Sequence, residues 1–309
     1  MTASEHRPQP AAPRVAVVGP GAIGTTIAAA LHASGRTPAL YGRTARASLE
    51  LLVGDARIVV PGPVRTRPAE LDAEVDGGAD VVFLAVKATQ IDAAAPWLRA
   101  LCGRDTVVCV LQNGVEQVAM VSPHVAEGVT VLPSVVWFPA QAQHDGTVRL
   151  RGDARLTVPA GGDADRIAAV LDGTLCTVEV SADFPAMAWR KLLQNAAAGL
   201  MALTGRRAGV FHRDDMADLT RAYLQECAEV ALAEGVAVDA GVADGILASF
   251  HSAPADLSTS ILTDREAGRP LEWDVRNGVV SRLAARHGIR TPVSDLVATL
   301  LAATSDGPG

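Results

Sequence analysis

The stretch Gly19-Pro20-Gly21-Ala22-Ile23-Gly24 constrains the fold of this chain more than any other. A short apolar run at 14–18 leads directly into it, and apolar residues at helical spacing follow. This order of strand, GxGxxG turn and helix is the context that a dinucleotide-binding fold requires. Its glycines permit a tight turn, close approach of a pyrophosphate, and close helix packing. Because a helix N-terminus offers free amides to phosphate, we expect the cofactor to bind Gly19, Gly21, Ala22, Ile23 and Gly24.

The segment after the second expected strand predicts which dinucleotide binds. That strand, 37–41, is followed by Gly42-Arg43-Thr44-Ala45-Arg46. An NAD-binding domain usually places an acidic residue here on the ribose hydroxyls, but no aspartate or glutamate appears before Glu50. Arg43, assisted by Thr44 or Arg46, would suit a 2′-phosphate, so we expect NADP(H) as the cofactor. The alternative is an arginine that is merely solvated in a loop.

Two further strands are expected to end at the same edge of the sheet. A continuous apolar run within residues 80–90 is typical of a buried parallel strand and brings Lys87 to its carboxyl end. After a helix near 91–101, a strand at 106–111 is followed by Gln112-Asn113-Gly114. Ligands of open α/β sheets bind outside the carboxyl ends of the strands, which favours a cofactor contact for Lys87 and cofactor and substrate contacts for Asn113. Asn-Gly is also strong turn chemistry, and both roles can hold for Asn113.

The remaining pattern predicts two domains. Residues 52–64 fit either a strand pair or an irregular excursion. From Pro185 onward the pattern is helical, with Gly, Pro and Asp signals between segments. We therefore expect an α/β fold: a Rossmann-type NADP(H)-binding domain at 1–182, with 1–13 flexible, and an all-helical substrate and catalytic domain at 183–309. The other expected strands are 129–137, 147–151, 155–159 and 177–180, and the other expected helices are 163–171, 186–204, 214–235, 239–251, 272–287 and 292–303.

Composition excludes several classes of protein. A net charge of -7 argues against nucleic-acid binding, which needs a basic face. The four cysteines form no CxxC pair, and the histidines lack metal-like spacing, so neither a disulfide framework nor a metal site is expected. Neither a signal peptide nor a run long enough to span a membrane is recognisable. We expect a cytoplasmic protein that acts on a small molecule; a homodimer is compatible with the sequence, which does not determine the oligomeric state.

The use of lysine indicates a candidate proton donor. Of the 27 lysines and arginines, only Lys87 and Lys191 are lysine. Arginine stays protonated near neutral pH, whereas the pKa of a lysine shifts readily on burial. Lys191 and Asn195 are four residues apart, so a helix presents both on one face. We expect this polar face to line a cleft. The alternative is that the two side chains simply face solvent.

A later segment, 257–278, combines hydroxyl groups and carboxylates around a Gly-Arg-Pro loop. Ser260 is a candidate ligand for a substrate carboxylate, and Glu272 for a substrate hydroxyl. The simpler interpretation is that residues 258–260 cap a helix and that Glu272 is a first-turn acidic residue.

Together these motifs resemble the ketopantoate reductase (2-dehydropantoate 2-reductase) family over nearly the whole chain. The matching blocks, in chain order, are Gly19 to Gly24, Val86-Lys87 with Gln90, Gln112-Asn113-Gly114, Trp189-Arg190-Lys191 with Asn195, Ser260 with Asp264, and Glu272 with Asn277-Gly278.

The resemblance implies an enzyme of pantothenate biosynthesis that uses NADPH to reduce a 2-oxo acid. In such enzymes the lysine matching Lys191 is the general acid, and the residues matching Glu272 and Asn195 bind the substrate hydroxyl. The serine matching Ser260 contacts the substrate carboxylate. The residues matching Lys87 and Asn113 line the cofactor side of the cleft, which Glu272 also faces.

Two positions depart from the family pattern, and the change at Gly199 is the larger one. The family commonly has a second asparagine four residues after the one matching Asn195, but this chain has Gly199 there, and Ile261 replaces a usual methionine after Ser260. Because an unmatched polar group is costly, the substrate could instead be another 2-oxo or imino acid. A further alternative is a non-catalytic NADP(H)-binding sensor, which the retention of Lys191 and Glu272 disfavours.

Overall fold

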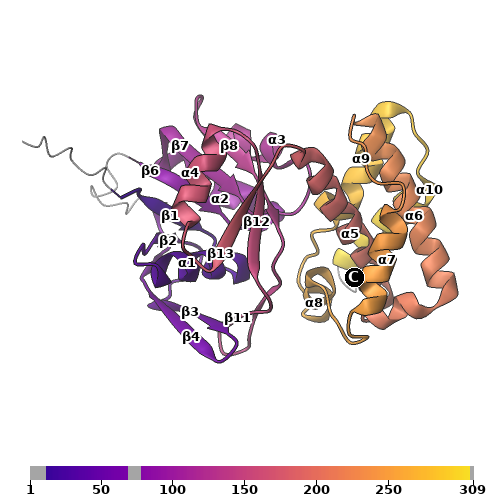
Figure 1. Cartoon of the computed structure of the whole chain (residues 1–309), viewed down its shortest axis with the longest axis horizontal. Coiled ribbons are helices and arrows are strands. Elements are labelled where there is room, and N and C mark those ends of the chain that lie inside the picture. The colour runs from indigo at the N-terminus through magenta and orange to yellow at the C-terminus, as the bar shows by residue number, and fades with distance from the viewer. Residues whose placement is uncertain (1–11, 69–77, 307–309) are drawn as a thin grey trace, which may run out of the picture.

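The computed structural model describes residues 12–68 and 78–306 and has two halves joined through helix α5 (Figure 1). One half contains the sheets and the other consists of helices. The fold class expected from the sequence is therefore confirmed. Most of the N-terminal stretch that was expected to be flexible lies outside the described residues. None of the helices within the described ranges is long and apolar enough to cross a membrane.

The central sheet has six parallel strands in the order β5-β2-β1-β6-β7-β8. Numbered along the chain within this sheet, the order is 3-2-1-4-5-6, as in the Rossmann fold. Parallel strands whose order reverses beside the first strand leave a crevice at their carboxyl ends. The strands are β1 (Val15–Val18), β2 (Ala39–Tyr41), β5 (Val64–Arg65), β6 (Ala79–Leu84), β7 (Cys102–Val110) and β8 (Thr130–Pro133).

The central parts of the long strands β6 and β7 are apolar because both faces of the sheet are covered there. Alternate residues of a strand point to opposite faces. On β6, Val81 and Phe83 join the core that includes α1 (Ala22–Ala33) and α4 (Gly162–Leu171). Val82 and Leu84 join the core formed with α2 (Ile91–Leu101) on the other face.

Residues 52–64, for which the sequence left two alternatives, contain a strand pair. β3 (Ser48–Val53) and β4 (Ala56–Pro61) form an antiparallel hairpin. The hairpin extends a second sheet through β11 (Val148–Leu150) to β10 (Ala140–Ala142). A third sheet contains β9 (Val135–Val136), β12 (Ala154–Pro159) and β13 (Cys176–Ser181).

The helical half begins two residues after β13 ends. The long helix α5 (Phe184–Thr204) starts where Asp183 accepts a hydrogen bond from the backbone of Ala186, and it ends at Gly205, which is in the left-handed conformation. The domain boundary at 182/183 remains a prediction.

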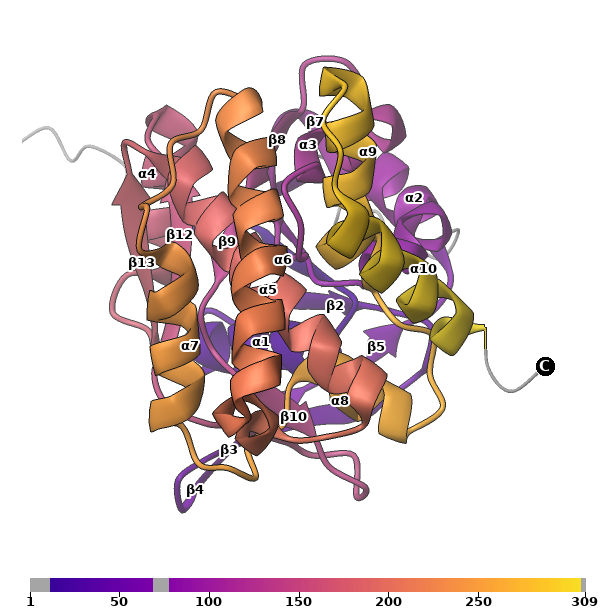
Figure 2. The same ribbon diagram turned by 90° about the vertical axis from the view of Figure 1, so that its right-hand side faces the viewer.

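Figure 2 shows α6 running across the face of this half, with α7 on one side and α9 and α10 on the other. Their inward residues form one core with α5. The expected helices are present, and the sequence missed two short ones, α3 and α8. The elements are α3 (Gln117–Val121), α6 (Asp214–Ala233), α7 (Val242–Ser252), α8 (Ser260–Glu266), a π-helical turn (Asp274–Gly278), α9 (Val279–His287) and α10 (Pro292–Ser305), with short 3-10 turns at Ala88–Gln90, Ser122–His124 and Ala208–His212.

Candidate active site

The glycine turn has the geometry of a phosphate-binding loop. Gly19 has a φ of 87°, and a Cβ there would lie 2.5 Å from Val86 Cγ1. A Cβ at position 24 would lie 2.5 Å from the oxygen of Gly19. A Cβ at Gly21, by contrast, would meet no atom within 4 Å. Two glycines are thus required by close packing, and the third faces open space in which a pyrophosphate fits.

The amides above this turn are available to a ligand. Helix α1 begins at Ala22, and its first backbone hydrogen bond runs from the Thr25 amide to the Gly21 carbonyl oxygen, at 2.8 Å. The amides of Ala22, Ile23 and Gly24 precede that bond, so they have no acceptor within the helix. The five residues of the glycine turn that were predicted to bind the cofactor therefore lie together around one helix N-terminus.

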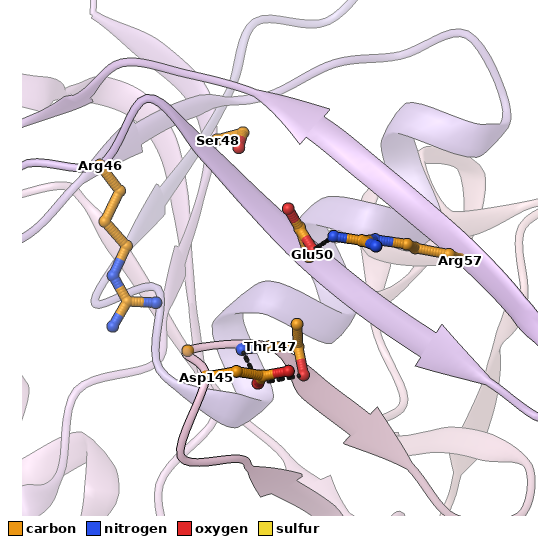
Figure 3. A pocket seen from close by; sticks show the side chains of 7 residues that line it. Arg46, Ser48, Glu50, Arg57, Asp145 and Thr147 are labelled. Carbon is orange, nitrogen blue, oxygen red and sulfur yellow. Dashed lines mark hydrogen bonds and ion pairs between the residues drawn. The ribbon is translucent and has the colours of Figure 1, made fainter.

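The loop after β2 lies beside the glycine turn. A Cβ at Gly42 would lie 2.9 Å from the Cδ of Pro20. Arg43 and Arg46 follow and are exposed, and neither guanidinium has a hydrogen bond or ion pair within residues 12–68 and 78–306. Figure 3 shows Arg46 at the edge of a hollow of about 410 Å³, apart from the bonded Glu50 and Arg57. Two cations are thus available where an adenosine ribose would be expected.

Three side chains form a hydrogen-bonded chain between the halves. Glu272 Oε1 accepts from the amide of Ala88 at 3.2 Å, and Oε2 accepts from Asn113 Nδ2 at 3.3 Å. Asn113 Oδ1 accepts from Asn195 Nδ2 at 3.2 Å. Ala88 and Asn113 follow β6 and β7, whereas Asn195 and Glu272 belong to the helical half. The structure therefore brings these three predicted site residues together at the carboxyl edge of the sheet.

Asn113 and Gly114 lie where the chain turns toward the helical half, and the expected ligand contacts of Asn113 remain a prediction. The residue after it, Gly114, has a φ of 103°, and a Cβ there would lie 3.1 Å from the oxygen of Val275. The Asn113-Gly114 pair therefore makes the turn and also lets the helical half approach closely, while the Asn113 side chain bonds to Glu272.

Lys87 makes a second link between the halves. Its Nζ donates to Asp264 Oδ2 at 2.6 Å, and Asp264 Oδ1 accepts from Arg269 Nε at 2.9 Å. Asp264 is buried on α8, while the side chain of Lys87 is 35% exposed. Lys87 thus lies at the predicted edge, and its ammonium is held by a carboxylate of the helical half.

Lys191 lies one helical turn before Asn195 on α5. Its Nζ is 5.1 Å from the centroid of the Trp137 ring, which is within the range of a cation-π contact. The described residues give this ammonium no hydrogen bond or ion pair. Burial, together with the positive charge of Arg276, lowers the pKa of Lys191 to about 8. Lys191 is thus a partly buried acid with an available proton, and it is not bonded to Glu272.

Ser260 is the first residue of α8, and its hydroxyl accepts a hydrogen bond from Arg276 Nη2 at 3.0 Å. The capping interpretation of residues 258–260 is wrong, because Thr259 at the N-cap makes no side-chain capping bond. Ser258 instead bonds to the Thr259 carbonyl and to Thr263.

Two residues near the site, Arg276 and Trp137, were not predicted from the sequence. Arg276 is 4% exposed and donates through Nη2 to Asn195 Oδ1 at 3.3 Å as well as to Ser260. Its position four residues after Glu272 was a usable signal, since helical residues at that spacing are neighbours. Trp137 lies far from Lys191 in the chain, and no sequence pattern connected the two.

Gly199 faces the packed interior between α5 and the π-helical turn. A Cβ there would lie 2.6 Å from Asn277 Nδ2 and 3.0 Å from Leu301 Cδ1. Asn277 is fully buried and donates to the Ala196 carbonyl and the Tyr223 hydroxyl. The glycine therefore permits close packing; its expected effect on substrate specificity remains a prediction.

A Rossmann sheet with a glycine turn, joined to a helical half that contributes a lysine and a carboxylate, defines an oxidoreductase that depends on a pyridine nucleotide. Two family models match the chain: "Ketopantoate reductase PanE/ApbA" over residues 15–163 and "Ketopantoate reductase PanE/ApbA C terminal" over 183–305. The chain belongs to the ketopantoate reductase family.

Individual relatives agree with this assignment. The chain is 55% identical to the 2-dehydropantoate 2-reductase of Mycobacterium tuberculosis strain H37Rv, covering 96% of this chain and 99% of that protein. A PanE/ApbA family ketopantoate reductase of Ralstonia eutropha superposes with a TM-score of 0.85 at 27% identity, covering 95% and 98% of the two chains. A dimeric ketopantoate reductase of Staphylococcus aureus superposes with a TM-score of 0.83 at 27% identity, covering 96% and 100%.

Proposed function

We propose that this protein reduces 2-dehydropantoate (ketopantoate) to pantoate with NADPH. The observation that carries the proposal is the hydrogen-bonded chain from Ala88 through Glu272 and Asn113 to Asn195, which lies at the edge where a nicotinamide is expected. The names of relatives that match nearly the whole chain support the same substrate.

Lys191 is the proposed general acid. Reduction of a 2-oxo acid forms a C–H bond at C2 and leaves negative charge on the former carbonyl oxygen, which must receive a proton. An ammonium whose pKa is lowered to about 8 donates that proton more readily than an exposed lysine would. The Trp137 ring contacts the ammonium by a cation-π interaction, which leaves the N–H groups of Lys191 free to bond to the substrate.

Glu272 and Asn195 are the proposed ligands of the substrate hydroxyl, and Ser260 of its carboxylate. Glu272 is 9% exposed and already accepts two hydrogen bonds, which fixes its orientation. Asn113 bonds to both Glu272 and Asn195, so it positions the two side chains relative to each other. A substrate held at three points would present its C2 carbonyl in one orientation.

The cofactor assignment rests on the first half of the chain. When bound, NADPH supplies the hydride for C2. The amides above Gly21 fit its pyrophosphate, and the unpaired Arg43, with Arg46 nearby, fits a 2′-phosphate. Lys87 would face the cofactor from the end of β6, although its ammonium is bonded to Asp264.

NADPH oxidation followed with 2-dehydropantoate and a panel of other 2-oxo acids tests the function. We expect the largest kcat/KM with 2-dehydropantoate. Faster turnover of another 2-oxo acid would support the substrate change suggested by Gly199 and contradict our assignment. NADPH binding without turnover of any compound would indicate the sensor instead.

We also propose a homodimer, since a relative of known structure is described as dimeric. Sedimentation equilibrium of the purified chain should give about twice its 31.9 kDa mass. A monomer at micromolar concentration would contradict this.

A further inference from the structure

Arg276 is a buried cation whose hydrogen-bonding capacity is only partly used. Its guanidinium lies on the π-helical turn and is 4% exposed. Nη2 donates to Asn195 Oδ1 and to Ser260 Oγ, while Nε is buried without a partner. Nη1 has no hydrogen bond among the described residues. Arginine carries five N–H donors, so those of Nη1 and Nε have no partner among the described residues.

No carboxylate of the described residues forms an ion pair with Arg276. Glu272, the first of the two nearby acids, is bonded to Ala88 and Asn113. Asp264, the second, is bonded to Lys87 and Arg269. Burying a charge without a close partner is costly, and arginine matches the geometry of a carboxylate. The vicinity of Arg276 is therefore complementary to an anion that the chain does not itself provide.

The two acceptors of Arg276 are the residues expected to contact substrate. Because the Ser260 oxygen accepts from Arg276, the hydrogen of that hydroxyl remains free to be donated elsewhere. A carboxylate beside them could accept one bond from Ser260 and one from Nη1. Arg276 is also close enough to Lys191 for its charge to lower the pKa of that lysine.

We infer that Arg276 binds the carboxylate of the 2-oxo acid and makes the enzyme selective for the charged acid over neutral analogues. The inference rests on the proposed function and adds a residue to it. Ser260 then completes the carboxylate site, and Asn195 is oriented by Arg276 on one side and Asn113 on the other.

The test compares 2-dehydropantoate with its neutral amide in wild type and in Arg276→Met. We expect wild type to favour the acid strongly. Arg276→Met should lower kcat/KM for the acid by about 100-fold or more, mainly through KM, because a buried charge partner is lost. Its kcat/KM for the amide should fall by a factor at least about tenfold smaller, because only the bond to Asn195 and the charge beside Lys191 are lost there, so that most of the selectivity disappears. Arg290→Met, which removes an exposed arginine of the helical half, is the matched control and should behave as wild type.

A purely structural role for Arg276 predicts a different result. Both substrates would lose activity equally and the acid-to-amide ratio would stay at its wild-type value, which would overturn the inference. Because loss of a buried guanidinium can destabilise the fold, Arg276→Lys is measured alongside. It keeps the charge but not the planar fork, and we expect a smaller rise in KM for the acid alone. Equal activity of wild type on acid and amide would also refute the inference, and inactivity of wild type on both would refute the proposed function with it.

Discussion

Lys191 is a stronger acid in this fold than an exposed lysine would be. Burial disfavours its charged form, and Arg276 adds like-charge repulsion. A general acid is most effective when its pKa lies near the working pH. The same surroundings that partly bury the side chain therefore prepare it to donate a proton.

The pH dependence of turnover should report this pKa. Lys191 carries its proton below a pH of about 8 and loses it above, so kcat/KM for reduction should fall about tenfold per pH unit on the alkaline side. Initial rates at low 2-dehydropantoate and saturating NADPH measure it, with NADPH affinity as the control. A profile that stays flat well above a pH of about 8 would exclude Lys191 as the donor.

Arg43 should determine the choice of cofactor. Its guanidinium is exposed and unpaired within the described chain, so a 2′-phosphate can bind it without breaking an existing contact. We expect Arg43→Ala to weaken NADPH binding by about 10-fold or more, as loss of a charged hydrogen bond of about 1.5–3 kcal/mol implies. NADH binding should change little. Fluorescence titration measures the affinity for both cofactors. Equal losses of affinity for NADPH and NADH would show that Arg43 does not bind the 2′-phosphate.

Among the elements, α5 packs directly against the π-helical turn that carries Arg276. Gly199 lets the Asn277 amide approach α5, and Asn277 is next to Arg276. A π-helical turn changes which side chains share a face, because its hydrogen bonds span five residues. This packing helps to place Arg276 beside Asn195 and Ser260.

Alanine at position 199 should therefore destabilise the protein, although alanine favours helices. The new Cβ would lie 2.6 Å from a buried amide fixed by two hydrogen bonds, and overpacking of this kind costs about 1–3 kcal/mol. Gly245→Ala on α7 is the matched control, because nothing lies within 4 Å of its Cβ. That variant should gain up to about 1 kcal/mol. Urea unfolding measures both, and a stabilised Gly199→Ala would show that Asn277 can move freely.

The predictability of the elements follows from their length and periodicity. Strands such as β1 and β6 are continuous apolar runs because both faces are buried, and α5 combines a capping aspartate with a terminal glycine. Helix α8 has only seven residues. It lies among hydroxyl, glycine and proline residues that are typical of turns, so the sequence showed no helical periodicity there. The π-helical turn has no signature in a 3.6-residue period.

In the whole molecule, the site depends on contacts between residues far apart in the chain. Glu272 bonds to Ala88 across 184 positions, and Lys87 to Asp264 across 177. The sequence could place Lys87 and Asn113 at the edge of the sheet and Lys191 with Asn195 on one helix face. It could not show which side chains bond across the halves, because that depends on how the surfaces of the two halves meet.

In the proposed mechanism the helical half donates the proton and the sheet half binds the cofactor. NADPH oxidation by Lys191→Ala with 2-dehydropantoate, combined with an NADPH titration, tests this most directly. The neighbouring exposed residue supplies the control, Arg190→Ala, which should keep wild-type turnover. For Lys191→Ala we predict a loss of about 10²–10⁴-fold in kcat with NADPH affinity unchanged. Near-normal turnover of this variant would contradict the account.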